Sequence, residues 1–147
     1  MIAQVVLLFA VAASGAVALG RFSLDSPLRD LGLVAGSLLI VAGAFVFVRG
    51  LRDLGDNLTA VPRPKADAAL VQAGIYRRMR HPIYAGMVFS ALGWALFSWS
   101  GIAVVLAMAL AVVLDLKARL EEGWLTARYP TYGEYRARTH RFLPGIY

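Results

Sequence analysis

The chain has 147 residues, of which 59% are hydrophobic and 16% are charged, and its formal net charge is +6. Soluble domains average about 45–50% apolar and about 25% charged residues, so this composition predicts a single membrane-embedded domain over residues 1–147. The absence of cysteine excludes disulfide scaffolds, thiol nucleophiles and thiolate metal sites. The chain has only two histidines, and we expect no metal.

Uncharged stretches at residues 1–20, 31–48 and 82–114 predict the membrane spans. A span needs about 20 apolar residues, and the third stretch is too long for one crossing. Turn-forming residues around Trp99 divide it into a helical hairpin. We therefore predict an all-α integral membrane protein with four spans, at about 1–20, 31–48, 82–98 and 101–118. The first span lacks a basic n-region, so we expect it to be retained rather than cleaved.

The distribution of the basic residues predicts the orientation. Only Arg21 and Arg29 flank the loop after the first span, whereas the other thirteen of the 15 lie in residues 49–81 and 117–147. Basic loops stay cytoplasmic, so we expect both termini, the loop at 49–81 and the tail at 119–147 inside the cell. The prediction is a protein of a prokaryotic cytoplasmic membrane. The membrane orientation explains the net positive charge, so we expect no nucleic-acid partner.

Small residues recur at helix-packing spacing on the second span, at Gly32, Gly36 and Gly43. Similar pairs occur on the first span and on the third. Such faces serve either packing within one bundle or homodimerisation. The sequence favours the former and leaves a homodimer open.

Most of the residues that could take part in catalysis or ligand binding lie in the two predicted cytoplasmic segments. Residues 50–81 begin as an irregular loop around Pro62, Arg63 and Pro64 and end in a basic run before Pro82, which suits the first turn of a helix. Spacing alone explains these arginines as topology markers as well as it explains an anion site.

The tail begins with charged residues at helical spacing, which a solvated ion-pair face would explain. The adjacent carboxylates Glu121 and Glu122 can instead hold a cation or accept a proton. Tyr129, Tyr132 and Tyr135 are three residues apart, which is typical of an aromatic stripe on one side of a helix. An interfacial belt and a cofactor pocket both account for this stripe.

Two motif blocks resemble the isoprenylcysteine carboxyl methyltransferase family and its phospholipid methyltransferase relatives. The first block comprises Leu70, Val71, Gly74, Tyr76, Arg77, Arg80, His81, Pro82, Tyr84 and Gly86. The second comprises Glu121, Glu122, Tyr132, Tyr135, Arg138, Leu143 and Pro144. The resemblance covers roughly residues 50–147, with a helical hairpin between the blocks. One departure is Tyr129 and Pro130, where many members carry a Phe-Gly pair.

The resemblance implies an integral-membrane methyltransferase that uses S-adenosylmethionine. Its acceptor would be embedded in the bilayer or lipid-like, with a carboxylate, an amine or an isoprenoid group. The implied catalytic residues are Glu121, Glu122 and Arg138. The implied cofactor-binding residues are Tyr76, Arg80, His81, Pro82, Tyr84, Glu122, Leu143 and Pro144.

Two alternatives remain. Membrane sterol reductases, which use NADPH, carry a segment similar to the one around His81, and a non-catalytic membrane scaffold would retain the fold without the chemistry. The sequence has no Gly-x-Gly-x-x-Gly loop, which argues against a Rossmann dinucleotide site and the soluble methyltransferase fold.

Overall fold

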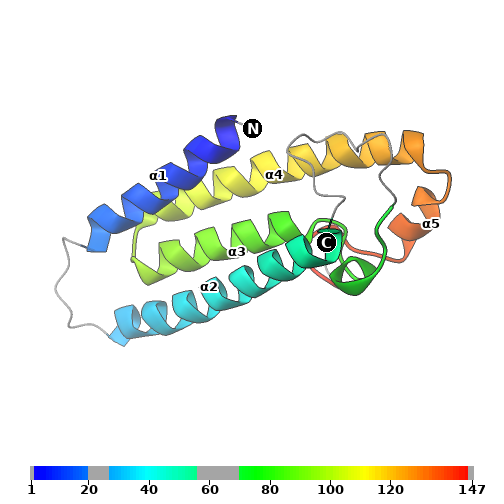
Figure 1. The fold of residues 1–147 in the computed structure, drawn as a ribbon. Helices are drawn as coiled ribbons and strands as arrows, with labels where there is room; N and C mark the ends of the chain where they lie inside the picture. The colour runs from blue at the N-terminus through cyan, green and yellow to red at the C-terminus, as the bar shows by residue number, and fades with distance from the viewer. Residues whose placement is uncertain (1, 20–26, 56–69, 146–147) are drawn as a thin grey trace. The chain divides into compact units, whose positions relative to one another are not determined.

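The computed structural model describes residues 2–19, 27–55 and 70–145. The loop that holds Arg21 and the predicted irregular segment around Pro62, Arg63 and Pro64 lie outside these residues. The helices are, in chain order, α1 (Ile2–Leu19), α2 (Pro27–Leu54), the short 3-10 helix η2 (Gly74–Arg77), α3 (Pro82–Phe97), α4 (Gly101–Arg128) and α5 (Tyr132–Ala137) (Figure 1).

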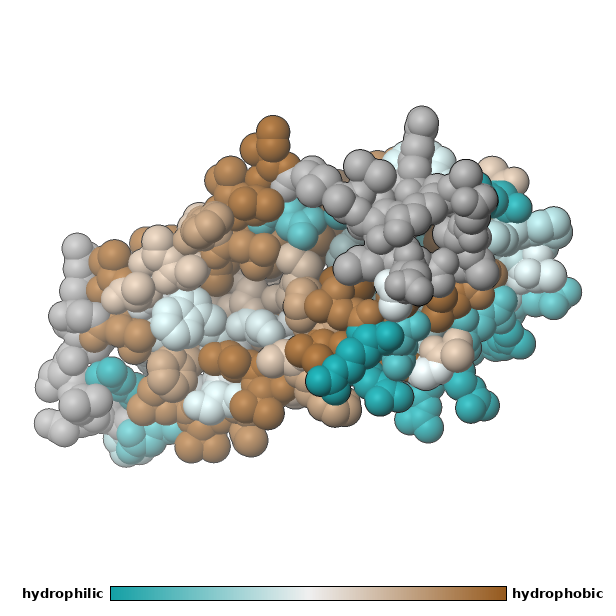
Figure 2. All heavy atoms as spheres, viewed as in Figure 1, coloured by the Kyte–Doolittle hydropathy of each residue, from teal (hydrophilic) through white to brown (hydrophobic). Residues whose placement is uncertain are grey.

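The chain forms two compact units, one of residues 1–45 and 86–114 and the other of residues 46–85 and 115–147. Among the described residues, α1, α2 and α4 are long and apolar enough to cross a membrane, and α3 is a shorter apolar helix. Large apolar side chains of the first unit point outward, among them Phe9, Phe45 and Val105. Figure 2 shows mainly hydrophobic residues on the first unit and hydrophilic ones gathered on the second. Exposed apolar faces of this kind suit a lipid environment.

Glycines on α2 allow close packing against α3 within the first unit. A Cβ added at Gly36 would lie 2.5 Å from the backbone nitrogen of Phe97, and one at Gly43 would lie 2.6 Å from that of Ser90. Only residues without a side chain allow two helix backbones to approach so closely. The predicted small-residue face of α2 is therefore used inside the chain.

A tight turn joins α3 to α4 where the hairpin was predicted. Trp99 has a φ of +52°, in the left-handed region. The hydroxyl oxygen of Ser100 accepts a hydrogen bond from the backbone N–H of Ala103 at 3.1 Å and so caps the start of α4. Both α2 and α4 continue past the predicted span ends at residues 48 and 118, and charged side chains beyond these ends form ion pairs, Arg49 with Asp53 on α2 and Glu122 of α4 with Arg80.

The second unit is held by buried tyrosines. The Tyr135 hydroxyl donates to the carbonyl oxygen of Tyr76 at 2.8 Å, and the Tyr76 hydroxyl donates to that of Gly50 at 3.3 Å. Tyr132 packs edge-on against Tyr135. The predicted stripe of three tyrosines is interrupted, because α4 ends at Arg128 before Tyr129 and Pro130, and α5 begins at Tyr132. Tyr132 and Tyr135 therefore form part of the core of this unit.

Candidate active site

All residues of the candidate site belong to the second unit. The segment before α3 runs beside the tail: the backbone N–H of Arg80 donates to the carbonyl of His140 at 2.8 Å, and that of His81 donates to Arg141 at 3.1 Å. These bonds adjoin a parallel bridge between Met79 and His140. Side chains that are about 60 residues apart in sequence are thereby held next to each other.

Glu122 is the electrostatic centre of the site. Glu122 is only 3% exposed and lies on the buried side of α4. Its Oε1 accepts hydrogen bonds from Arg80 Nε at 2.9 Å and from Arg141 Nε at 3.1 Å, and its Oε2 accepts one from Arg141 Nη2 at 3.1 Å. A buried carboxylate is tolerated when it is paired and hydrogen-bonded in this way. Glu122 therefore links α4 to the segment before α3 and to the tail.

The Arg80 side chain also holds the tail by hydrogen bonds to the tail's backbone. Its Nη1 donates to the carbonyl oxygens of Thr139 and Arg136 and to the Thr139 hydroxyl. Arg141 reaches a second carboxylate, since its Nη1 lies 2.9 Å from Asp115 Oδ1. The two arginines and the two acidic residues thus form one ion-pair network, which fixes the tail against α4.

Glu121 has a different environment from its neighbour. Its side chain is 15% exposed, and one carboxylate oxygen accepts a hydrogen bond from the Tyr84 hydroxyl. The other oxygen lies 3.6 Å from His81 Nδ1. Lys117 lies 4.9 Å above the Tyr84 ring, which is a cation–π distance. No arginine contributes a contact to Glu121 among those described, so this carboxylate is the more available of the two.

His81 lies between the two carboxylates. Its Nε2 is 3.4 Å from Glu122 Oε1 without a hydrogen-bond geometry, and its ring is stacked on that of Tyr84 with 5.5 Å between centroids. His81 is 8% exposed and Tyr132 is 1% exposed, yet the His81 Nε2 and the Tyr132 hydroxyl have no hydrogen-bond partner in the described part of the chain. Buried polar atoms normally have partners, so these two atoms suit a polar ligand or an ordered water.

Burial also changes the acidity of the tyrosines around the site. Desolvation raises the pKa of Tyr135 to about 12, partly opposed by the nearby charge of Arg80. Desolvation raises the pKa of Tyr132 well above its usual value, and the charge of Glu122 adds to this effect. Desolvation likewise raises the pKa of Tyr76. These three phenols stay protonated, and each can serve as a hydrogen-bond donor.

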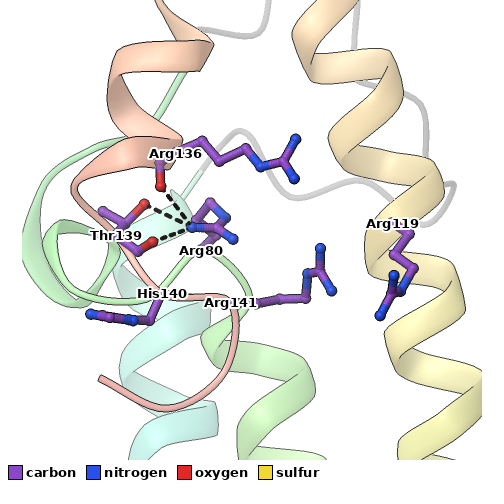
Figure 3. A pocket seen from close by; sticks show the side chains of 6 residues that line it. All are labelled: Arg80, Arg119, Arg136, Thr139, His140 and Arg141. Carbon is purple, nitrogen blue, oxygen red and sulfur yellow. Dashed lines mark hydrogen bonds between the residues drawn. The ribbon is translucent and has the colours of Figure 1, made fainter. Parts of the chain in front are cut away.

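A pocket of about 340 Å³ opens beside this network (Figure 3). Six residues from α4, α5, the segment before α3 and the tail line it, namely Arg80, Arg119, Arg136, Thr139, His140 and Arg141. The described residues contain no group of three or more His, Cys, Asp or Glu side chains placed to hold a metal ion.

The model of the family described as phospholipid methyltransferase matches residues 31–132, more than half of the chain. The chain belongs to the phospholipid methyltransferase family. The match contains the first motif block and both glutamates, so the family resemblance of those motifs is confirmed.

Two curated relatives of this phospholipid methyltransferase family member were found. The cobalt-zinc-cadmium resistance protein CzcN of Cupriavidus metallidurans is 34% identical over 78 residues, which are 52% of this chain and 36% of that protein. The protein-S-isoprenylcysteine O-methyltransferase of Saccharomyces cerevisiae is 26% identical over 117 residues, which are 77% of this chain and 49% of that protein. The chain thus matches about half, or less, of each relative's length.

A solved structure shares the fold of this family member. The eukaryotic intramembrane Ras methyltransferase ICMT superposes with a TM-score of 0.71 at 19% identity, over 99% of this chain and 52% of that one. The prediction of an all-α integral membrane fold is therefore confirmed.

The structure brings together five of the residues that the family resemblance implied, which are Arg80, His81, Tyr84, Glu121 and Glu122. Pro82 is fully buried at the start of α3, next to His81. Tyr76 is buried in the tyrosine core and linked through hydrogen bonds to Gly50 and Tyr135.

The other three implied residues lie apart from the glutamates. Arg138 is exposed at the end of α5 and donates to the side chain of Gln72. Leu143 is 38% exposed, and Pro144 lies in an exposed turn that ends at Gly145, with a φ of +85°. No contact between these three residues and either glutamate is described.

The sequence did not identify Arg141, which donates hydrogen bonds to Glu122, whereas Arg138, the tail arginine that the resemblance implied, does not contact it in the described part of the chain. Both are basic residues of the same tail, and spacing alone did not distinguish them. The available signal was the position of Arg141 two residues before Leu143 and Pro144, which end the second motif block.

Proposed function

We propose that the protein transfers a methyl group from S-adenosylmethionine to a membrane-embedded or lipid-like acceptor with a carboxylate, an amine or an isoprenoid group. The observation that carries this proposal is the pair of adjacent carboxylates with opposite environments around His81. One of them, Glu122, is saturated by arginines, and the other, Glu121, is not. Membership of the phospholipid methyltransferase family supports it.

The residues present fit such a donor. S-adenosylmethionine, when bound, supplies an electrophilic methyl group on a sulfonium centre. The stacked rings of His81 and Tyr84 offer aromatic faces that suit an adenine or a sulfonium cation. The His81 Nε2 and the Tyr132 hydroxyl, which have no hydrogen-bond partner among the described residues, supply buried polar atoms for a ligand. Glu121 can attract an ammonium group.

Each side chain then has a defined task. Glu122 positions Arg80 and Arg141 and so keeps the tail in place, which is alignment rather than chemistry. Glu121 can instead accept a proton from an amine acceptor at Oε2, the oxygen that faces His81. A carboxylate acceptor would need no such base. We further propose that this site faces the cytoplasm and that the protein resides in a prokaryotic cytoplasmic membrane.

Calorimetric binding to the detergent-purified full chain tests the proposal. We expect S-adenosylmethionine and S-adenosylhomocysteine to bind, and we expect Glu121→Gln to weaken S-adenosylmethionine binding about tenfold, the loss of one charge-assisted contact. Glu134→Gln, an exposed glutamate of α5, is the matched control. Binding of NADPH alone would indicate a reductase, and a folded protein that binds none of the three ligands would indicate a scaffold.

A further inference from the structure

Asp53, in the last turn of α2, is bound to the segment that leads into the candidate site. Its side chain is 15% exposed. Its Oδ2 accepts a hydrogen bond from the backbone N–H of Ile75 in η2 at 2.7 Å and another from Arg49 Nε at 3.1 Å. The bond with Ile75 joins residues that are 22 positions apart in sequence, and both belong to the second unit.

This carboxylate caps η2 from another helix. The first N–H groups of a helix have no partner within the helix, and a side chain just before it normally accepts one of them. The residue in that position is Ala73, whose methyl group cannot accept a hydrogen bond. Asp53 therefore supplies the acceptor for the second residue of η2, which is one of the two places where a capping side chain ordinarily binds.

Gly74 allows the Asp53 carboxylate to come this close. It has a φ of +58°, in the left-handed region that favours glycine. A Cβ at this position would overlap the Oδ2 atom and the carboxylate carbon of Asp53. Backbone conformation and contact with Asp53 thus both require a glycine here, which accounts for this member of the first motif block.

Ile75 connects this cap to the candidate site. Its carbonyl oxygen accepts hydrogen bonds from the backbone N–H groups of Arg78 and Met79, at 3.1 and 3.2 Å. The next two residues along the chain are Arg80 and His81. Both polar groups of the Ile75 backbone are therefore engaged, one by the α2 carboxylate and the other by the turn that leads into the site.

A neutral hydrogen bond joins the same two elements, from the Tyr76 hydroxyl to the carbonyl oxygen of Gly50 at 3.3 Å. The bond between Asp53 and the Ile75 N–H is shorter and charge-assisted. Hydrogen bonds with an ionised partner are about twice as strong as neutral ones. Asp53 is therefore the stronger of these two attachments of η2 to α2.

We propose that Asp53 is a positioning residue, which sets the places of Arg80 and His81 by holding the backbone of η2. Its effect on the methyl donor rests on the proposed function, because Arg80 and His81 belong to the proposed donor site. Its effect on the His81 ring does not, so the two can be measured separately.

The first measurement is the NMR spectrum of the full chain in detergent, with ¹³C at Cε1 of the histidines. The chain has only two histidines, and His140→Gln assigns their ring resonances. The variants are Asp53→Ala, which removes the acceptor, and Asp53→Asn, which keeps an oxygen in its place. Arg49→Gln is the matched control, because it removes the 52% exposed partner of the same carboxylate oxygen and leaves the bond to Ile75.

We expect Asp53→Ala to shift the His81 resonance, and Asp53→Asn to shift it less, since an amide oxygen still accepts from an N–H group. Arg49→Gln should leave the resonance in place, because exposed ion pairs contribute little. A merely structural role would lower the unfolding midpoint of the Asp53 variants without moving the ring resonance of the folded protein.

The second measurement is calorimetric binding of S-adenosylhomocysteine. We expect the Kd to rise about tenfold in Asp53→Ala, the loss of one hydrogen bond to a charged group, and less than about threefold in Asp53→Asn. In Arg49→Gln the Kd should stay within about twofold of that of the parent.

Gly74→Ala tests the same contact from its other side. The added methyl group would displace the Asp53 carboxylate, so we expect the same shift of the His81 resonance and a rise in Kd of about tenfold. Combining it with Asp53→Ala should again give about tenfold rather than about a hundredfold, because both changes break one contact. If Asp53→Ala does not fold, Asp53→Asn and Gly74→Ala carry the test.

Three results would overturn the proposal. The first is a His81 resonance that stays in place in folded Asp53→Ala and Gly74→Ala. The second is an equal shift in Arg49→Gln, and the third is a loss of about a hundredfold in the double variant, which would mean two separate effects. A parent that binds no S-adenosylhomocysteine would overturn the proposed function instead, and the His81 resonance would then decide the role of Asp53 by itself.

Discussion

Replacing Glu122 by glutamine tests how the tail is held. The substitution preserves the shape of the side chain but leaves the guanidiniums of Arg80 and Arg141 beside a neutral amide in a position that is 3% exposed. Removing one partner of a buried ion pair costs about 3–5 kcal/mol, since the remaining charge is buried without compensation. For a chain of this size, such a loss lowers the unfolding midpoint by roughly 10 °C. Arg141 retains Asp115, so we expect the lower end of this range.

The assay is thermal unfolding in detergent, followed by circular dichroism, combined with trypsin digestion. Trypsin cleaves after arginine, and the tail presents Arg136, Arg138 and Arg141. We expect Glu122→Gln to lower the midpoint and to speed cleavage in the tail, whereas Glu134→Gln leaves both unchanged because Glu134 is exposed. The reasoning is refuted if the two variants have the same midpoint and the same cleavage rate.

Two further predictions concern packing and pH. Gly36→Ala should destabilise the protein by about 1–3 kcal/mol, because the new Cβ would lie 2.5 Å from the backbone of Phe97. Gly123→Ala, where nothing lies within 4 Å of the new Cβ, should be neutral or stabilising. Equal unfolding midpoints for the two variants would contradict this prediction. The pKa of Tyr135 is about 12 in the folded protein and about 10 in the unfolded chain. This difference contributes about 3 kcal/mol to the free energy of unfolding, which is fully present below pH 10 and is lost as the pH rises to about 12. Between pH 8 and 12, the unfolding midpoint of Tyr135→Phe should therefore fall less steeply with pH than that of the parent. Identical slopes would rule out this linkage.

The apolar helices could be read from the sequence because they follow from local composition. The predicted spans at residues 1–20 and 82–98 are close to α1 (Ile2–Leu19) and α3 (Pro82–Phe97). Backbone groups in lipid must be satisfied within the segment, so a long apolar run has few alternatives to a helix. The continuation of α2 past residue 48 was missed, because charged residues end the apolar run there, whereas the helical spacing of the charged residues at the start of the tail already indicated that α4 continues.

The sequence indicated several residues that the structure brings together, but not the contacts between them. The motifs indicated His81, Tyr84, Glu121 and Glu122, which lie together in the structure. The different environments of the two glutamates were not predictable, because adjacent residues on a helix face directions about 100° apart and only the packing of α4 decides which one is buried.

By itself, the sequence determined the membrane class of the protein, the positions of its apolar helices and the motif residues of its family, since these depend on composition and local spacing. Only the tertiary structure decided which arginine of the tail forms hydrogen bonds with Glu122. The pairing of Met79 with His140 sets the register of the tail and brings Arg141, rather than Arg138, to the carboxylate. Such a register depends on contacts between segments far apart in the chain, and no local pattern in the sequence specifies it.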